Sequence, residues 1–206
     1  MKNKLNIIYE DEEVIVCNKR SNQLTIGKDY NDFNSLYHEV YEYVHKKTGG
    51  RIFVVHRLDK DTSGIIIFAK TGTVKEKLQL IFENHKVERK YEAVVEGKMK
   101  GKGTIKVNLS EDKFHNVFVT KKGVEAITKY EVLNVKDNRS LLDIELVTGK
   151  RNQIRASLSF LGHTIIGDKK YNGIKNNRLL LNAYKLVFPN GTLKVNEFQI
   201  SKLFNL

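Results

Sequence analysis

The sequence predicts an α+β protein with a large, mostly antiparallel sheet and a few flanking helices. Short runs of β-type residues follow one another along most of the chain. Only three segments show the spacing of an amphipathic helix. No Gly/Ser/Pro-rich linker divides the chain, and Pro189 is its single proline. We therefore expect one domain over residues 1–206, and two closely packed lobes are the alternative.

The runs expected to form strands combine branched and aromatic residues and are separated by turn residues. Between two of them, the irregular stretch Lys98–Lys122 is rich in Gly and Lys. It suits a basic hairpin that could contact nucleic acid, and a solvated hairpin is the alternative. The expected strands are Leu5–Tyr9, Glu13–Cys17, Gly64–Lys70, Lys90–Glu96, Gly103–Leu109, Asn116–Thr120, Ala126–Val132, Leu141–Val147, Arg178–Phe188 and Leu193–Ile200.

Three segments are expected to be helices because their apolar residues recur every three or four positions. Thr73 and Glu76 have the spacing of a capping box, so the second helix is expected to start near them. The apolar stripes are Phe33, Leu36, Val40 and Val44 in the first helix, Val74, Leu78, Ile81 and Phe82 in the second, and Ile154, Leu158 and Leu161 in the third.

Composition supports a folded, basic protein. Hydrophobic residues make up 40% of the 206 residues, enough for a sizeable core. The net charge is +12, and it is uneven: residues 1–50 hold 7 basic and 8 acidic residues, so the remainder holds 29 and 16. The electric field of such a positively charged region attracts polyanions at long range. The alternative is a lysine-rich protein that binds no polyanion.

The chain has no feature of a secreted or membrane protein. Cys17 is the single cysteine, so no disulfide can form within the chain, and a reducing compartment is expected. Met1–Glu13 is charged and lacks the apolar stretch of a signal peptide. The longest aliphatic run, about Ile65–Ala69, is too short to span a bilayer. We expect a soluble, cytoplasmic protein.

The sharpest local motif is a polar loop that leads directly into an apolar strand. Such loops often carry functional sites, because the strand fixes what the loop presents. The alternative is a turn in which Asp61, Thr62 and Ser63 bond the backbone and Gly64 permits close packing. The motif reads His56-Arg57-Leu58-Asp59-Lys60-Asp61-Thr62-Ser63-Gly64.

Two further segments are candidates. Lys150, Arg151 and Arg155 crowd the start of the third helix, where the helix dipole disfavours positive charge, so an anion is expected nearby. Arg155 follows the core-facing Ile154 and would need a partner if buried. The alternative is a solvated basic turn. Tyr91 lies in an expected strand, where core packing is the ordinary role of a tyrosine.

These segments together resemble the RluA-type pseudouridine synthases over about residues 5–188. The motif His56-Arg57-Leu58-Asp59-x-x-Thr62-Ser63-Gly64 is complete at every fixed position. Lys90-Tyr91-x-Ala93 is similar to the tyrosine motif of that family, and Gln153-Ile154-Arg155 to its third motif. Departures occur at Lys19-Arg20-Ser21-Asn22, Arg151-Asn152, Ala156-Ser157 and Asn182, and they bear on RNA contacts and target choice.

The resemblance implies the pseudouridine synthase fold, without the S4-type module common in the family. It also implies the reaction, in which the N1–C1′ bond of a uridine breaks and the base rejoins the ribose through C5. No cofactor or metal is needed, because there is no net redox change or group transfer. The implied substrate is structured RNA, ribosomal or transfer, and we expect a monomer with no obligate protein partner.

The resemblance also assigns roles to residues. Asp59 would be the catalytic carboxylate, acting on C1′ or on the 2′ proton. Arg155 would pair with Asp59 and keep it ionised, and Tyr91 would pack on the base and help remove the C5 proton. Arg57 would hold the uridine out of its stack. His56 is expected to contact RNA with it. Lys150 and Arg151 are expected to meet backbone phosphates because of their charge and their place in the chain, and not because of the resemblance.

Two other classes of function remain open. A non-catalytic RNA-binding relative would keep the basic surface and lose the reaction. A metal-dependent phosphodiesterase would use Asp59 and Asp61 as metal ligands, and it would need further acidic or histidine ligands. Release of tritium from 5-tritiated uridine in RNA separates these classes, because only a synthase displaces that hydrogen.

Overall fold

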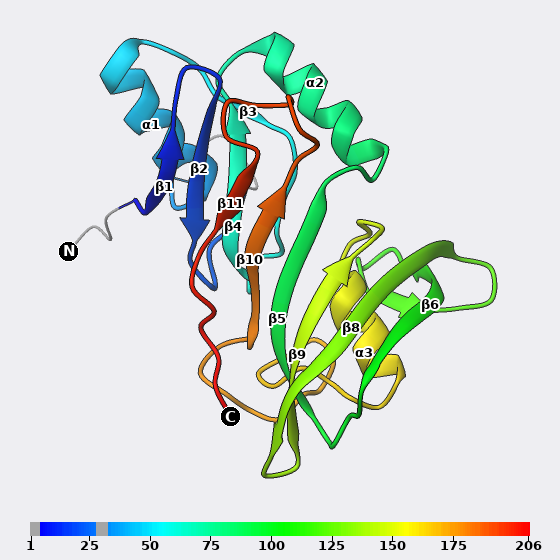
Figure 1. Ribbon diagram of the computed structural model, residues 1–206. Helices are drawn as coiled ribbons and strands as arrows, with labels where there is room; N and C mark the ends of the chain where they lie inside the picture. Colours follow the sequence, from blue (N-terminus) through cyan, green and yellow to red (C-terminus); the bar gives the residue numbers. More distant parts are fainter. Residues whose placement is uncertain (1–4, 28–32) are drawn as a thin grey trace. The chain divides into compact units, whose positions relative to one another are not determined.

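The computed structural model describes residues 5–27 and 33–206. In this part of the chain it contains three helices and eleven strands, and the strands form a large, mostly antiparallel sheet, so the expected α+β class is confirmed (Figure 1). The contacts divide the chain into two compact units. Unit 1 comprises residues 1–87 and 185–200, and unit 2 comprises residues 88–184 and 201–206.

The sheet of unit 1 is built on β4 (Ser63–Ala69), in which all seven residues are buried. It pairs antiparallel with β2 (Val14–Lys19) and β3 (Phe53–Val54), and β2 pairs with β1 (Ile7–Glu10). β11 (Glu197–Gln199) pairs with the end of β10 (Leu181–Val187) that belongs to this unit. A strand buried along its whole length must be covered on both faces.

Two helices provide this cover. α2 (Gly72–Glu83) contributes Val74 and Leu78 to a core that includes Ile65 and Ile67 of β4. Tyr37 of α1 (Leu36–Thr48) meets Phe68 of β4 with ring centroids 6.3 Å apart. Because Ile67 and Phe68 are consecutive strand residues, they point to opposite faces. The two helices therefore cover opposite sides of β4.

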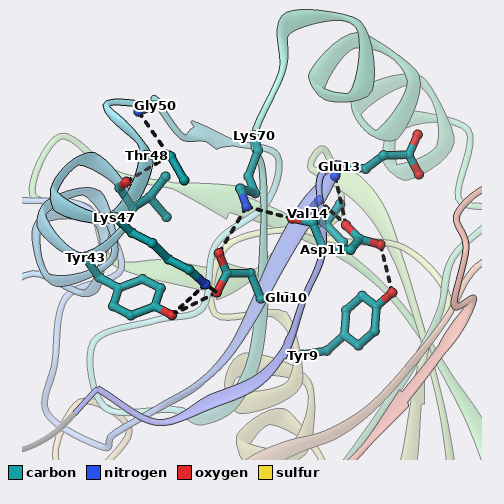
Figure 2. Close-up of polar contacts among 11 residues, drawn as sticks. Tyr9, Glu10, Asp11, Glu13, Val14, Tyr43, Lys47, Thr48, Gly50 and Lys70 are labelled. Carbon is teal, nitrogen blue, oxygen red and sulfur yellow. Dashed lines mark hydrogen bonds and ion pairs between the residues drawn. The ribbon is translucent and has the colours of Figure 1, made fainter.

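Two acidic residues at the β1–β2 turn, Glu10 and Asp11, make hydrogen bonds that stabilise unit 1 (Figure 2). Glu10 accepts hydrogen bonds from Tyr43 and Lys47 of α1, both at 2.9 Å, and from Lys70 after β4 at 3.0 Å. Asp11 accepts the backbone N–H groups of Glu13 and Val14, both at 2.8 Å, and so closes the turn. These contacts attach the edge of the sheet to α1.

Unit 2 is an antiparallel sheet with one helix. Its strands β5 (Glu88–Glu96), β9 (Arg139–Leu146), β8 (Val124–Lys136), β6 (Lys102–Glu111) and β7 (Val117–Val119) are adjacent in that order. α3 (Gln153–Phe160) contacts β6, β7 and β8, and Ala156 packs with Leu109, Val117 and Ala126. The expected hairpin in Lys98–Lys122 is confirmed as β6–β7.

Several expected boundaries are wrong. Thr71, rather than Thr73, caps α2, because its side chain accepts the N–H of Val74. The expected strand Leu193–Ile200 shrinks to β11, because Asn196 accepts the N–H of Leu193 at 2.8 Å and closes a turn. The expected strand Arg178–Phe188 shrinks to β10, and β3 was not expected.

Two residues of the expected apolar stripes lie outside their helices. Phe33 precedes α1 and is 60% exposed, and Leu161 follows α3 and is 42% exposed. The first helix starts later because Ser35 caps it, accepting the N–H of His38. No helix within residues 5–27 and 33–206 is long and apolar enough to cross a bilayer.

Candidate active site

The loop between β3 and β4 carries the motif around Asp59, and the expected order of a polar loop and a buried strand is confirmed. The Asp59 carbonyl accepts the N–H of Thr62 at 3.2 Å, which makes a turn directly before β4. Asp59 and Asp61 are half-buried, and Arg57 is exposed. Gly64 follows with φ 119°, a conformation that favours glycine.

Residues 19–25 hold this loop in place through its backbone carbonyls. The buried ammonium of Lys19 donates to the carbonyl of Lys60 at 3.0 Å, and Ser21 donates to the carbonyl of Asp61 at 2.7 Å. Thr25 bonds both the carbonyl and the N–H of Leu58. The backbone on both sides of Asp59 is thus held by hydrogen bonds within unit 1.

Lys19 is a residue whose role the sequence did not reveal. Its side chain is fully buried, and it also donates to the carbonyls of Arg20 and Gln23 at 2.9 and 2.6 Å. A buried ammonium is costly unless it is hydrogen-bonded, and three carbonyls meet that need here. In the sequence Lys19 stood only as the first residue of a segment, Lys19-Arg20-Ser21-Asn22, that departs from the family pattern.

His56 makes structural contacts within unit 1. Its Nε2 accepts the N–H of Ile67 at 3.1 Å, and its ring stacks on Phe82 of α2 with centroids 4.6 Å apart. A nitrogen that accepts a hydrogen bond carries no proton, so the imidazole is neutral in this arrangement. These contacts hold the start of the motif against β4 and α2. The expected RNA contact of His56 stays a prediction.

Cys17 is not a candidate nucleophile. Its side chain is fully buried in β2. Burial, together with the charges of Glu10 and Glu39, raises the pKa of its thiol to about 12. A thiol in this state is almost entirely protonated at neutral pH and is therefore a poor nucleophile.

Tyr91 lies on β5 in unit 2, opposite Ile144 of β9, and is 7% exposed. Arg89 is two residues earlier on the same face of the strand. It is buried, and burial lowers the pKa of its guanidinium while the electrostatic interaction with the Tyr91 side chain acts to raise it. Its Nη2 donates to the carbonyl of Val147 at 2.8 Å, and among the described residues its Nε has no acceptor.

The turn before α3 is built on Gln153, which is buried with its amide fully used. Its Oε1 accepts the hydroxyl of Thr148 at 2.8 Å and the N–H of Lys150 at 3.0 Å. Its Nε2 donates to Ile127 and Thr128 of β8, both at 3.0 Å. This amide joins the turn that carries Lys150 and Arg151 to β8. Gln153 therefore has a structural role beside these two cations.

Arg155 is buried, and the expectation that it needs a partner is confirmed. Its Nε and Nη2 donate to the two carboxylate oxygens of Asp168 at 2.7 and 2.8 Å. Asp168 is fully buried and also accepts the N–H groups of Lys170 and Tyr171. The expected pairing of Arg155 with Asp59 stays a prediction, and Asp168 was not foreseen as the residue that orients this guanidinium.

Lys150 and Arg151 are exposed at the same turn, as expected for residues that meet phosphates. Arg151 also has a partner within unit 2, since its Nη1 donates to Glu111 of β6 at 2.6 Å. The seven predicted site residues therefore divide between the units. His56, Arg57 and Asp59 belong to unit 1, and Tyr91, Lys150, Arg151 and Arg155 belong to unit 2.

Comparison with known proteins identifies the family. The family model of RNA pseudouridylate synthases matches residues 13–160, which include Asp59, Tyr91 and Arg155. The chain belongs to this family. It is 35% identical over 191 residues to a Bacillus subtilis protein described as an uncharacterized RNA pseudouridine synthase, a match that covers 89% of this chain and 63% of that protein.

A second relative has a more specific name. The chain is 31% identical over 176 residues to ribosomal large subunit pseudouridine synthase D of Zymomonas mobilis, covering 81% of this chain and 56% of that protein. The chain thus spans somewhat more than half the length of these curated relatives.

Solved structures agree on the fold. The human RNA pseudouridylate synthase domain containing 1 superposes with a TM-score of 0.79 at 22% identity, covering 96% of this chain and 83% of that one. The human domain containing 4 gives 0.81 at 20% identity, covering 96% and 88%. At these identities the likeness is one of fold, and it confirms the expected pseudouridine synthase fold.

Proposed function

We propose that the chain is an RNA pseudouridine synthase that isomerises selected uridines in ribosomal or transfer RNA. The observation that carries this proposal is the complete motif around Asp59, in a family member, on a loop whose carbonyls are bound by Lys19, Ser21 and Thr25. Such a loop suits a carboxylate that must meet a ribose in one orientation. The reaction rearranges bonds within one nucleotide and needs no cofactor.

Three residues are proposed as catalytic. Asp59 attacks C1′ or removes the 2′ proton as the glycosidic bond breaks. Tyr91 packs on the base and assists removal of the C5 proton. Arg155 keeps Asp59 ionised, and its bidentate bond to Asp168 supports this role by fixing the direction of the guanidinium.

Four residues are proposed to bind RNA. Arg57, two residues before Asp59, is exposed and holds the flipped uridine, and His56, its neighbour in the sequence, contacts the RNA with it. Lys150 and Arg151 meet backbone phosphates. We further propose that residues 1–206 act as one catalytic domain, as a cytoplasmic monomer.

The test is tritium release from RNA that carries 5-tritiated uridine, with substrates prepared from cells without the gene. The wild-type chain is expected to release tritium, and Asp59→Asn is expected to release none while still binding RNA. Asp61→Asn is the matched control, because it makes the same change two residues away and Ser21 holds Asp61 by its carbonyl. A dead Asp61→Asn beside an active Asp59→Asn would refute the assignment.

The two alternatives give different results in the same assay. A non-catalytic RNA-binding protein binds RNA without releasing tritium. A phosphodiesterase shortens the RNA and stops when a chelator is added. Residues 5–27 and 33–206 contain no group of three or more His, Cys, Asp or Glu side chains able to hold a metal ion, which does not favour the phosphodiesterase.

RNA affinity is expected to fall steeply with salt, because lysines and arginines release counterions from phosphates. Lys150→Ala should reduce the slope of log affinity against log salt by about 1. Arg151→Ala is the less direct probe, since it also removes one of the partners of Glu111. An unchanged slope in Lys150→Ala would place the phosphates elsewhere.

A further inference from the structure

The tip of the β6–β7 hairpin, residues 112–116, is a closed and ordered turn. Asp112 Oδ1 accepts the N–H of Phe114 at 2.8 Å and that of Asn116 at 2.9 Å, and Oδ2 accepts the side-chain amide of Asn116 at 3.0 Å. The N–H of Asp112 donates to the carbonyl of Asn116 at 3.0 Å. The carboxylate of Asp112 thus makes three of the hydrogen bonds that order the tip.

This ordered tip presents an aromatic ring to solvent. Phe114 is 71% exposed, and the ammonium of Lys113 lies 5.1 Å from the centre of its ring. The next apolar residue, Val117, is buried against α3, so the hairpin is anchored while Phe114 is not used in that anchoring. A ring held out by a fixed backbone loses little further freedom when a flat group stacks on it.

The tip is attached to the basic turn before α3 and to the loop after it. Glu111 accepts from Nδ1 of His115 and from Nη1 of Arg151, both at 2.6 Å. The ammonium of Lys170 donates to the carbonyl of His115 at 2.6 Å and to Oδ1 of Asn152 at 3.1 Å. The exposed ring is therefore fixed relative to the turn that carries Lys150 and Arg151.

The surroundings of the ring are basic. The carboxylate of Asp112 in the tip and that of Glu111 directly before it are already hydrogen-bonded within unit 2. The bond from His115 lowers the pKa of Glu111, and the backbone bond from Asn116 lowers that of Asp112. The exposed cations on the tip and on the two attached segments are Lys113, Lys150, Arg151, Lys169 and Lys170.

We propose that the β6–β7 tip is a binding site for an unpaired RNA base, which stacks on the ring of Phe114 while the neighbouring cations hold the flanking phosphates. Proteins that bind single-stranded RNA combine these two elements, a positively charged track and aromatic rings on which bases stack. The inference rests on the proposed function for the identity of the polyanion. It adds that the bound RNA has an unpaired base near the phosphates that Lys150 is proposed to contact.

The test compares two RNA probes that carry the same fluorescent label: a short single strand and the same strand in a blunt duplex. Phe114→Ala should weaken single-strand binding by roughly five- to one-hundred-fold and leave duplex binding within about twofold. Phe114→Trp should bind the single strand as the wild type does. Phe160→Ala is the matched control, since Phe160 is 61% exposed in the same unit and should have no effect.

A second pair of variants tests the shape of the tip. Asp112→Ala removes the hydrogen bonds that order it and should reduce single-strand binding in the manner of Phe114→Ala. Asp112→Asn keeps the Oδ1 that accepts the N–H groups of Phe114 and Asn116, so it should restore binding.

Unchanged single-strand affinity in Phe114→Ala would overturn the proposal, and so would an equal loss for strand and duplex. A change in self-association without a change in RNA affinity would also overturn it, since the ring would then serve a protein contact. These outcomes are separate from those of the proposed function. Tritium release by the wild type together with normal binding by Phe114→Ala removes only this inference. Weaker binding by Phe114→Ala in a chain that isomerises no RNA removes only the proposed function.

Discussion

Arg155 and Asp168 form a buried ion pair, and its loss can be mistaken for a loss of catalysis. Asp168 is fully buried, so removing the guanidinium of Arg155 leaves the carboxylate of Asp168 as an uncompensated buried charge. We expect Arg155→Leu to lower the free energy of unfolding by roughly 3–5 kcal/mol. Thermal and denaturant unfolding of this variant, measured beside tritium release, checks the expectation.

The double variant Arg155→Leu/Asp168→Asn separates stability from chemistry. Asparagine removes the buried charge and keeps an acceptor for the N–H groups of Lys170 and Tyr171. The double variant should therefore regain much of the lost stability and still release no tritium. Recovered activity together with recovered stability would mean that Arg155 has only a structural role.

Tyr91 allows a test with little effect on packing. Tyr91→Phe keeps the buried ring on β5, so stability and RNA affinity should be unchanged. If the hydroxyl assists proton removal, single-turnover tritium release should slow by roughly 10²–10⁴-fold. A rate equal to that of the wild type would assign Tyr91 a packing role alone. Tyr91→Ala is the poorer probe, because the cavity it leaves costs about 3–5 kcal/mol.

The site residues differ in how far the sequence could identify them. The motif predicts Asp59 as the catalytic carboxylate, which stays a prediction, and the burial of Arg155, expected from its place beside a core-facing residue, is confirmed. Two supporting contacts were not foreseen, the bond of Lys19 to the backbone carbonyl of Lys60 and the ion pair of Asp168 with Arg155, because both depend on the folded chain. The Lys19–Lys60 bond joins residues 41 positions apart, and no local pattern encodes it.

At the scale of elements, Glu10 joins β1 to α1 and to the end of β4. Burial alone would raise its pKa, but hydrogen bonds from Lys47, Lys70 and Tyr43 lower it below the usual value of 4.5. A lowered pKa in the folded state means that the ionised group stabilises the fold above pH 4.5. That stabilisation is lost as pH falls through the lowered pKa.

We therefore expect Glu10→Gln to lower the free energy of unfolding by about 1.5 kcal/mol at pH 7, or roughly 3–6 °C in Tm. The difference from the wild type should shrink as pH falls below 4.5. Glu12→Gln is the matched control, because Glu12 is exposed two residues away and its loss should change little at any pH. A difference that persists unchanged at low pH would contradict the role given to the ionised carboxylate.

The elements themselves were largely predictable, and their ends were not. Periodicity located the three helices and nearly every strand, because the alternation of apolar residues is local. Thr71 and Asn196 show why the predicted boundaries were wrong. Thr71 caps α2 and Asn196 closes the turn before β11, each through a single side-chain bond to a backbone N–H. β3 has only two residues, Phe53 and Val54, and is too short to show a period.

At the scale of the whole molecule, the chain passes between the two units more than once. Unit 1 takes both of its helices and most of its strands from residues 1–87, and residues 185–200 add β11, the end of β10 and part of the core. The later segment supplies Leu186, Phe188, Leu193 and Phe198, which are 2%, 2%, 7% and 3% exposed. Neither end of the chain can therefore form this core by itself.

The last prediction follows from this interleaving. Burying four such side chains contributes about 6–12 kcal/mol, which is comparable to the entire stability of a typical domain. Residues 1–87 expressed alone should therefore show no cooperative unfolding transition. Joining residues 185–200 to them by a short Gly/Ser linker should restore one, because Val87 and Leu186 belong to the same core cluster. Replacing Phe188 and Phe198 with serine in the fusion is the control and should abolish the transition again. A cooperative transition in residues 1–87 alone would show that the later segment is dispensable for unit 1.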